Sequence, residues 1–476
     1  LSTIKTEMTL GQKTLVLLLL INPLLLDVSA QVRPACGIPV PELASLDSAM
    51  QNIMQANDIG AGVLALMKDN QVVYRRAFGW QDKKRSLPLR PDCMMRIASI
   101  TKPFTAAAIR HLIASGLISL ESQVFSDGDP TTGLLRYKAF GTRDARLTDI
   151  TVEHLLKHKG GWDRDEPGIP DHTYQEKQIA NEMGVESPPS RINVVRWIMG
   201  KPLQFAPGTD TAYSNIGYLL LGLIVEETTG QSLLDYLQTN VLDPIDISAG
   251  QVFYGRSFKA DQDLREPYYD AGGGLAANVF FPAFSDEPFV ERPYGNWNHE
   301  ARIGQGAMVA NPYAILSYLA AHQVNGSNIG GPRPSPGNWK WNHTGSLSGT
   351  NCLARQRGDG INYAVFFNKR PSSGNSYALQ MRLAIDDIIE SGAILSWPTA
   401  DVRYQDIPIP EIRIHADPTV LSFSSTTGRH YQLMQSTDLQ EWTPAAEPRI
   451  GDDNELNFRL PANNAELMYY RVEITQ

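Results

Sequence analysis

Strands are predicted at both ends of a long region of this chain, and helices fill its middle. Near the start, apolar segments at 62–67 and 71–78 flank a polar turn at 68–70, which predicts a hairpin of buried strands. Strands are next expected only late in the chain, at 343–354 and 361–367. One sheet must therefore join segments that are far apart in sequence, with a helical subdomain inserted between them.

Apolar residues at helical spacing, often followed by a glycine, predict the helices around these strands. We expect helices at residues 44–57, 104–115, 152–158, 218–229, 311–322 and 377–389. The predicted fold class is therefore α+β, an α/β sandwich in which helices flank one sheet.

The chain changes character after residue 396. Prolines interrupt residues 397–410, which we interpret as a linker. Beyond the linker, turn residues separate short strands at 420–423, 431–434, 455–460 and 468–474. They predict a small, sandwich-like all-β module over 411–476, with a core of Tyr431, Leu439, Trp442 and Tyr470.

The N-terminal residues have the pattern of a targeting segment. Lys5 and Lys13 precede an apolar run at 15–26, and small residues follow at 28–30. This order predicts a signal peptide over 1–30 that is cleaved near Ala30. The alternative, a membrane anchor, is disfavoured because the run is short and interrupted. We expect a periplasmic or extracellular protein without a stable membrane span, in which residues 31–396 form the main domain.

Composition excludes some partners. The formal net charge is −9, with 42% hydrophobic and 20% charged residues, as in ordinary soluble globular enzymes. Binding nucleic acid needs clustered Lys and Arg, so no nucleic-acid partner is expected. The spacing of Cys36, Cys93 and Cys352 fits no metal site. Two of the three could form a disulfide in an exported protein, and the sequence leaves the pairing open.

The first motif with chemical meaning is Ser99-Ile-Thr-Lys102. Residues three apart on a helix share a face, so Lys102 would lie beside the Ser99 hydroxyl and activate it. Pro103 and an Ala-rich run place the motif in a first helical turn, where free N–H groups favour an oxyanion. Taken alone, the spacing also arises by chance at an exposed helix start.

A second motif, Tyr213-Ser-Asn215, precedes an apolar helix. Beside a cationic Lys the Tyr213 phenol could relay a proton, and the Asn215 amide could hold Lys102 and a substrate carbonyl. Ser214 or Asn215 could equally serve as an N-cap, with Tyr213 packed beside it.

The third motif is His343-Thr344-Gly345-Ser346, at the start of a late strand. Gly345 would let a ligand approach the backbone closely. The Ser346 N–H could then bind an oxyanion together with the N–H of Ser99.

In this order and at these separations, the three motifs resemble those of the penicillin-recognising serine hydrolases. Within that superfamily the chain is similar to the class C β-lactamase-like branch, which holds carboxypeptidases, D-amino-acid peptidases and esterases. The resemblance covers about residues 43–391. It implies a β-lactamase/transpeptidase-like fold with an antiparallel sheet. It also implies that Ser99 is the nucleophile, Lys102 the base, Tyr213 a proton relay and Asn215 a positioning group.

Two positions depart from the pattern of that branch. His343 stands where class C β-lactamases carry Lys, although some DD-peptidases carry His there. The turn Lys157-His-Lys-Gly-Gly161 differs from the usual His-Thr-Ser-Gly form. Both departures bear on the substrate, which would contact His343, Thr344, Gly345 and Ser346.

These observations predict acyl transfer in two steps, without a metal or organic cofactor. The expected substrates are small molecules or peptides with an ester or D-amino-acid amide bond. One alternative is a β-lactamase, and another is a catalytically silent penicillin-binding-type scaffold. A contact with a surface or polymer through residues 411–476 is a further expectation.

Overall fold

The computed structural model describes residues 33–126, 132–166, 171–372, 374, 376–402, 413–416, 419–425, 430–436, 443–450, 455–459 and 469–475. The predicted signal peptide and its cleavage point near Ala30 lie outside these residues, as does most of the predicted linker. Within the described ranges, every helix is too short or too polar to cross a membrane.

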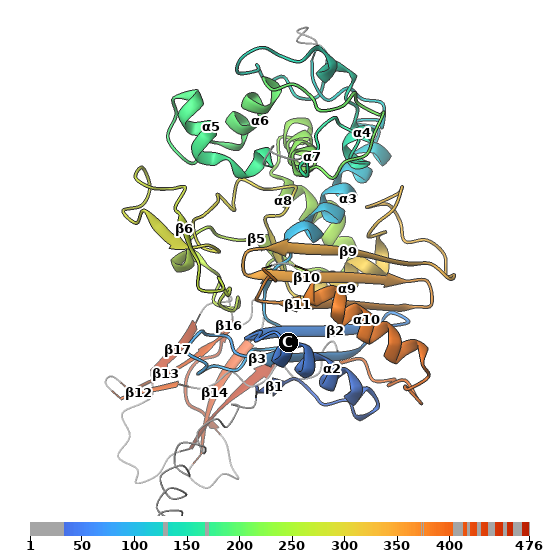
Figure 1. Ribbon diagram of the computed structural model, residues 1–476. Coiled ribbons are helices and arrows are strands. Elements are labelled where there is room, and N and C mark those ends of the chain that lie inside the picture. Colours follow the sequence, from blue (N-terminus) through green and yellow to red (C-terminus); the bar gives the residue numbers. More distant parts are fainter. Residues whose placement is uncertain are drawn as a thin grey trace, which may run out of the picture. The chain divides into compact units, whose positions relative to one another are not determined.

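A six-stranded antiparallel sheet joins both ends of the main region (Figure 1). Its order is β1 (Ala35–Cys36), β3 (Gln71–Gly79), β2 (Ala61–Lys68), β11 (Ile361–Phe367), β10 (Thr350–Arg357) and β9 (Lys340–Leu347). At its centre β2 pairs with β11, about three hundred residues later in the chain. The prediction of one sheet built from chain-distant segments is therefore confirmed.

One strand prediction was wrong in detail. Residues 343–354 were expected as a single strand, but β9 ends at Leu347 and β10 begins at Thr350. Gly349 turns the chain between them with φ of +75°, in the left-handed region that glycine adopts without steric cost. The Gly345 backbone therefore faces Cys352 across a tight hairpin.

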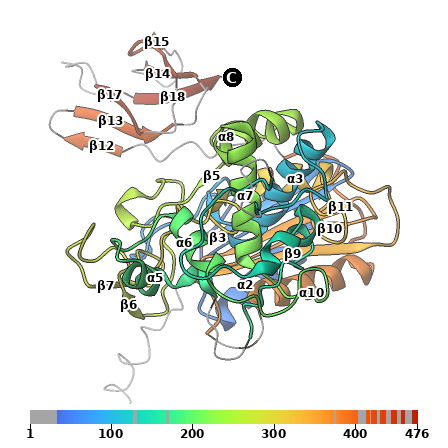
Figure 2. The same cartoon turned by 90° about the horizontal axis from the view of Figure 1, so that it is seen from above.

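Both faces of the central strands are buried, and side chains alternate between two cores. Leu64 and Leu66 of β2 lie in one core, and Val63 lies in the other. Helices α2 (Ala44–Ala56) and α10 (Tyr377–Glu390) cover the first face, while α9 (Pro312–Ala321) packs on the second (Figures 1 and 2). This double burial explains why β2 and β11 are continuous apolar runs.

The helical subdomain is inserted between β3 and β9. Its α-helices are α3 (Thr101–Ala114), α4 (Val152–Leu156), α5 (Glu176–Met183), α6 (Arg191–Met199), α7 (Asn215–Thr229) and α8 (Leu233–Leu237). Helices α5 and α6 were not predicted, since both are short and carry polar residues among their apolar ones. Helix α7 is buried on almost every side, begins at the Ser214 N-cap and ends at Gly230.

Short elements complete this region. The 3₁₀ turns are η1 (Pro41–Leu43), η2 (Ala98–Ile100), η3 (Ala145–Asp149), η4 (His172–Tyr174), η6 (Asp243–Ile245) and η7 (Lys259–Asp261), and η5 (Gln238–Leu242) is a π-helical turn. Strands β4 (Met95–Arg96), β8 (Met308–Ala310) and β5 (Val252–Tyr254) form one small sheet, and β6 (Leu275–Ala277) pairs with β7 (Phe289–Glu291).

Where the structure describes them, the C-terminal residues form strands and short connecting segments, and no helix. One sheet holds β12 (Arg413–Ala416), β13 (Thr419–Ser424) and β17 (Glu455–Arg459). The other holds β14 (His430–Ser436), β15 (Thr443–Pro444), β16 (Arg449–Ile450) and β18 (Tyr469–Thr475). Tyr431 is buried in their shared core, as predicted, whereas Leu439, Trp442 and the Tyr470 side chain lie outside the described part. The all-β prediction is confirmed.

The three cysteines are free thiols in this structure, so the disulfide that the sequence allowed is not formed. Cys93 and Cys352 are buried, and Cys36 is partly exposed. Within the described residues, no group of three or more His, Cys, Asp or Glu side chains is placed to hold a metal ion.

Candidate active site

Ser99 lies in the short turn η2, directly before helix α3. The preceding Ala98 has φ of +46°, a left-handed conformation that costs a residue with a Cβ atom about 1–2 kcal/mol. Ala98 is buried against Trp297 and Leu347, and this packing holds the turn in place. Ser99 itself is only partly buried, so its hydroxyl is presented to the surface at a fixed point.

The amine of Lys102 is fully buried and has three partners. Its Nζ lies 3.2 Å from Ser99 Oγ, 2.8 Å from Asn215 Oδ1 and 2.7 Å from the Gln305 backbone oxygen. Burial lowers the pKa of Lys102 well below its ordinary value, and the Arg164 guanidinium lowers it further. This shift makes the neutral form of the amine easier to reach, and a neutral amine can accept the Ser99 proton.

The Tyr213 phenol also lies close enough to the nucleophile for the Ser99 side chain to lower the pKa of the phenol, against the effect of burial. Burial raises the pKa of Tyr213 to about 12, so the phenol keeps its proton at neutral pH. Lys102 Nζ lies 4.8 Å from the centroid of the Tyr213 ring, and the Arg164 guanidinium carbon lies 4.2 Å from it. A protonated phenol at this position can donate a proton to a departing group.

His158 holds the Tyr213 segment in place. Its ring stacks on Tyr213 at 4.6 Å between centroids, and its Nδ1 accepts a hydrogen bond of 3.1 Å from the Ser214 N–H. Burial lowers the pKa of His158 to about 3, with the charge of Lys102 as the next cause. The imidazole is therefore neutral at pH 7. His158 was not predicted as a site residue, although it lies in the turn that departs from the resembled pattern.

The third motif lies on β9, which runs beside η2. A Cβ atom on Gly345 would come within 2.2 Å of the Ile97 backbone oxygen, so only glycine allows this approach. The next residue, Ser346, is exposed. The pairing of its N–H with that of Ser99 as an oxyanion hole stays a prediction.

His343 and Thr344 line a cavity of about 460 Å³ that also borders Tyr213 and His158. Burial lowers the pKa of His343 to about 4, and the charge of Lys102 contributes. His343 is consequently neutral at pH 7 and can accept or donate a hydrogen bond there. It does not supply the permanent charge that a Lys at this position would.

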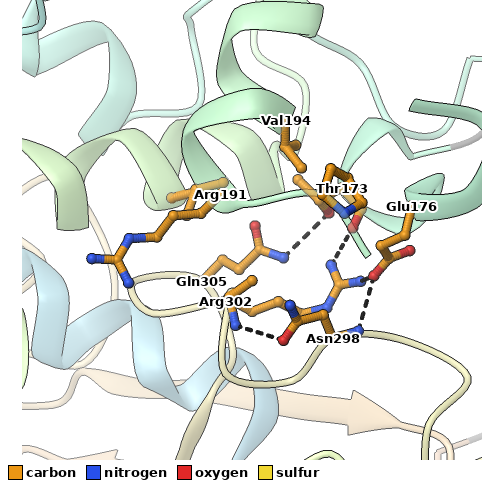
Figure 3. A pocket seen from close by; sticks show the side chains of 10 residues that line it. Thr173, Glu176, Arg191, Val194, Asn298, Arg302 and Gln305 are labelled. Carbon is orange, nitrogen blue, oxygen red and sulfur yellow. Dashed lines mark hydrogen bonds and ion pairs between the residues drawn. The ribbon is translucent and has the colours of Figure 1, made fainter. Parts of the chain in front are cut away.

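A buried ion pair between Arg302 and Glu176 lies near the Gln305 side chain (Figure 3). Arg302 Nη2 lies 2.5 Å from Glu176 Oε1, and Arg302 also donates to the Thr173 carbonyl. The Asn298 N–H donates to the same Glu176 oxygen at 3.1 Å. In the close view the Gln305 side chain points toward Thr173, 3.2 Å from its hydroxyl. The segments that carry Thr173 and Gln305 are thereby tied together.

The structure brings Ser99, Lys102, Tyr213 and Asn215 into one cluster and places β9 beside it. Gln305 and Asp171 were missed by sequence reasoning. Gln305 acts through its backbone carbonyl, which any residue type supplies. Asp171 accepts a hydrogen bond from Asn215 Nδ2 at 2.5 Å, and nothing near it in the sequence marks this role.

Comparison with protein families identifies the group to which this site belongs. The family model for Beta-lactamase matches residues 46–385, most of the chain. The chain belongs to the beta-lactamase family. The predicted membership of the penicillin-recognising serine hydrolase superfamily is thereby confirmed.

Known relatives of this beta-lactamase-family chain differ in their activities. Esterase EstB of Burkholderia gladioli is 29% identical over 210 residues, which is 42% of this chain and 49% of that protein. The chain thus matches about half the length of this curated relative. An octameric penicillin-binding protein homologue from Pyrococcus abyssi has a TM-score of 0.51 at 20% identity, covering 85% of this chain and 90% of the other.

A D-amino acid amidase from Ochrobactrum anthropi SV3 has a TM-score of 0.50 at 20% identity, covering 74% of this chain and 98% of the other. At such identities these two structural likenesses show a shared fold and no more. They confirm the predicted β-lactamase/transpeptidase-like architecture.

Proposed function

We propose that this protein is an exported serine hydrolase that cleaves ester or amide bonds through an acyl-enzyme on Ser99. One observation carries the proposal. A fully buried amine, with its pKa well below the ordinary value, lies 3.2 Å from a partly exposed hydroxyl on a rigid turn. A neutral amine in that place activates a serine hydroxyl.

Acylation follows from the positions of Lys102 and Tyr213. Ser99 Oγ attacks the substrate carbonyl carbon while its proton passes to Lys102 Nζ. The N–H groups of Ser99 and Ser346 hold the resulting oxyanion. When the bond to the leaving group breaks, Tyr213 gives its proton to the departing alcohol or amine and recovers one from Lys102. The product of this step is an ester between Ser99 and the acyl group.

Deacylation uses the same groups in reverse. A water molecule attacks the ester carbon and gives a proton to the Lys102–Tyr213 pair. The C–O bond to Ser99 then breaks, Ser99 recovers its proton, and a carboxylic acid leaves. No step in this scheme needs a metal or an organic cofactor.

Two features support esters or D-amino-acid amides as substrates. The relative EstB is named an esterase, and His343 replaces the Lys of class C β-lactamases. A neutral His343 attracts a substrate carboxylate less strongly than a Lys would, which makes β-lactam turnover the second candidate. A silent scaffold is disfavoured because Ser99, Lys102 and Tyr213 lie within reach of one another.

A substrate panel with an activity probe tests this function. The purified protein is treated with a fluorophosphonate, then assayed with p-nitrophenyl esters, D-alanyl amides and nitrocefin. We expect stoichiometric labelling of Ser99 and faster turnover of the ester or amide than of nitrocefin. A Ser99→Ala variant whose circular dichroism spectrum matches that of the native protein should lose both the labelling and the turnover. An unlabelled native protein, or a fully active variant, would overturn the proposal.

Export and surface contact are separate parts of the proposal. The charged and apolar pattern of residues 1–30 supports export, and mass spectrometry of the secreted protein should find an N-terminus near Gln31. Deleting residues 411–476 should abolish retention on a surface or polymer and leave ester turnover unchanged. If retention is unchanged after the deletion, residues 411–476 do not provide the contact with the surface or polymer.

A further inference from the structure

We infer that Asp171 is a positioning residue: it fixes the Asn215 side chain with the carbonyl oxygen toward Lys102, so that the amine lone pair stays available to Ser99. This inference rests on the proposed function, because it assigns a further group to the same reaction.

The hydrogen-bond capacity of a neutral amine gives the reason. Such an amine has two N–H groups and one lone pair. Two of the partners around Lys102 Nζ are carbonyl oxygens, Asn215 Oδ1 at 2.8 Å and the Gln305 backbone oxygen at 2.7 Å. Carbonyl oxygens only accept hydrogen bonds, so they occupy both N–H groups. The lone pair is left for the third partner, the Ser99 hydroxyl at 3.2 Å.

The orientation of the Asn215 amide decides whether this arrangement holds. An amide carries an oxygen acceptor at one corner and an NH₂ donor at the other. If the amide were turned over, its NH₂ would face Lys102 and compete with Ser99 for the lone pair. Asp171 prevents this, because an ionised carboxylate only accepts, and Asn215 Nδ2 donates to its Oδ2 at 2.5 Å.

The Asp171 carboxylate is itself held by its surroundings. Its Oδ1 accepts hydrogen bonds from the Thr173 N–H at 3.0 Å and from the Thr173 hydroxyl at 2.7 Å. The Thr173 carbonyl accepts from Arg302, which lies three residues before Gln305 and pairs with Glu176 (Figure 3). One buried guanidinium therefore anchors two segments: the one whose Asp171 holds Asn215, and the one whose Gln305 carbonyl contacts Lys102.

Asp171 also acts on the charge of the amine. Its carboxylate raises the pKa of Lys102, against the effects of burial and of Arg164. The other titratable groups that face the amine come from neighbouring elements: Tyr213, Tyr218, His158 and His343. Removing the Asp171 charge should therefore lower the pKa of Lys102 further and move the acid limb of the activity profile to lower pH.

Kinetics of acylation across pH test this role. The variants are Asp171→Ala, which loses the acceptor, and Asp171→Asn, which keeps the shape without the charge. The rate constant for fluorophosphonate labelling of Ser99 is measured from pH 4 to pH 9, with circular dichroism melting as the check on folding. The control is Asp210→Asn, which removes an exposed charge whose carboxylate accepts from the Thr211 N–H.

We expect Asp171→Ala to slow labelling by about 10- to 100-fold at the plateau, since small misplacement of a catalytic group costs about this much. Asp171→Asn should slow labelling by a smaller factor. Both should show an acid limb at lower pH, and Asp210→Asn should match the native protein. A purely structural role would reduce the active fraction and the melting temperature without moving that limb.

Two outcomes would overturn the role of Asp171. One is a native labelling rate in both Asp171 variants, and the other is an acid limb that does not move in folded Asp171→Asn. If Asp171→Ala does not fold, Asp171→Asn alone decides between these results. Failure of the native protein to label at Ser99 contradicts the proposed function and not the role of Asp171.

Discussion

Two buried cations lie close together in this molecule and are treated in opposite ways. Arg302 is 3% exposed and forms an ion pair with Glu176, so its charge is compensated inside the protein. Lys102 is fully buried, and among the described residues no carboxylate lies within ion-pair distance of its amine. Burial without a carboxylate in direct contact lowers the pKa of Lys102 and makes its neutral form easier to reach, although the more distant Asp171 opposes this shift. Arg302 therefore stabilises the structure as a paired charge, whereas the Lys102 amine is available for proton transfer.

Replacing Lys102 by Met should have the largest effect on activity. Without the amine Ser99 has no base, and we expect a loss of order 10⁴-fold in labelling and in ester turnover. The free energy of unfolding should change by less than about 2 kcal/mol, because loss of the three hydrogen bonds of the amine is offset by removal of a desolvated amine. Urea denaturation and stopped-flow assays measure the two quantities. If the Lys102→Met variant is inactive because it is unfolded, the contrast between a catalytic Lys102 and a structural Arg302 is contradicted.

Replacing Arg302 by Met should have its main effect on stability. Glu176 would be left as an uncompensated buried charge, which typically costs about 3–5 kcal/mol. The double change Arg302→Met with Glu176→Gln should recover part of that loss, since no lone charge remains. Chemical denaturation of the single and double variants checks this. Equal stability of the Arg302→Met variant and the native protein would show that the pair does not hold the fold.

The Tyr213→Phe variant separates the ring beside Lys102 from its hydroxyl. The aromatic ring that faces the amine remains, so the pKa of Lys102 should change little. The proton for the leaving group is lost, and turnover should fall by about 10²-fold. The loss should be smaller for p-nitrophenyl esters, whose leaving group departs without a proton, than for alkyl esters. Equal losses for both substrates would contradict the assigned role.

The last prediction concerns stability against pH, where the change per pH unit is small. Folding lowers the pKa of His343 from 6.5 to about 4 and that of His158 to about 3. The unfolded chain therefore binds more protons between these values and 6.5, so stability falls as pH drops through that range. Each histidine contributes at most about 1.4 kcal/mol per pH unit. In urea denaturation at pH 4–6.5, the free energy of unfolding of a His343→Asn variant should fall less steeply with decreasing pH than that of the native protein. Identical slopes for the two proteins would show that His343 does not contribute.

The extent of sequence prediction differed between these parts of the molecule. Apolar patterning placed β11 and α10 almost to the residue, because a continuous apolar strand and a regular amphipathic helix both leave strong patterns. The hairpin between β9 and β10 was missed because the two turn residues, Ser348-Gly349, lie inside a segment that otherwise has the composition of one strand. Short, partly polar helices such as α5 leave too little pattern to detect.

The same contrast holds within the site. Ser99, Lys102, Tyr213 and Asn215 were found because their side-chain types occur in motifs with chemical meaning. Gln305 was missed because it contributes a backbone carbonyl, and only the folded chain shows where that carbonyl points. Partners that meet through tertiary contacts alone leave no local signal in a single sequence.

The pairing of β2 with β11 also bears on when the candidate active site becomes complete during synthesis of the chain. A ribosome that has made residues up to α7 has already added Ser99, Lys102 and Tyr213. The centre of the sheet and Gly345 follow only with β9, β10 and β11, so the nascent chain has no complete cleft until then. Such long-range pairing is slow to form. The arrangement of the candidate catalytic side chains is therefore complete only after the last central strand is in place.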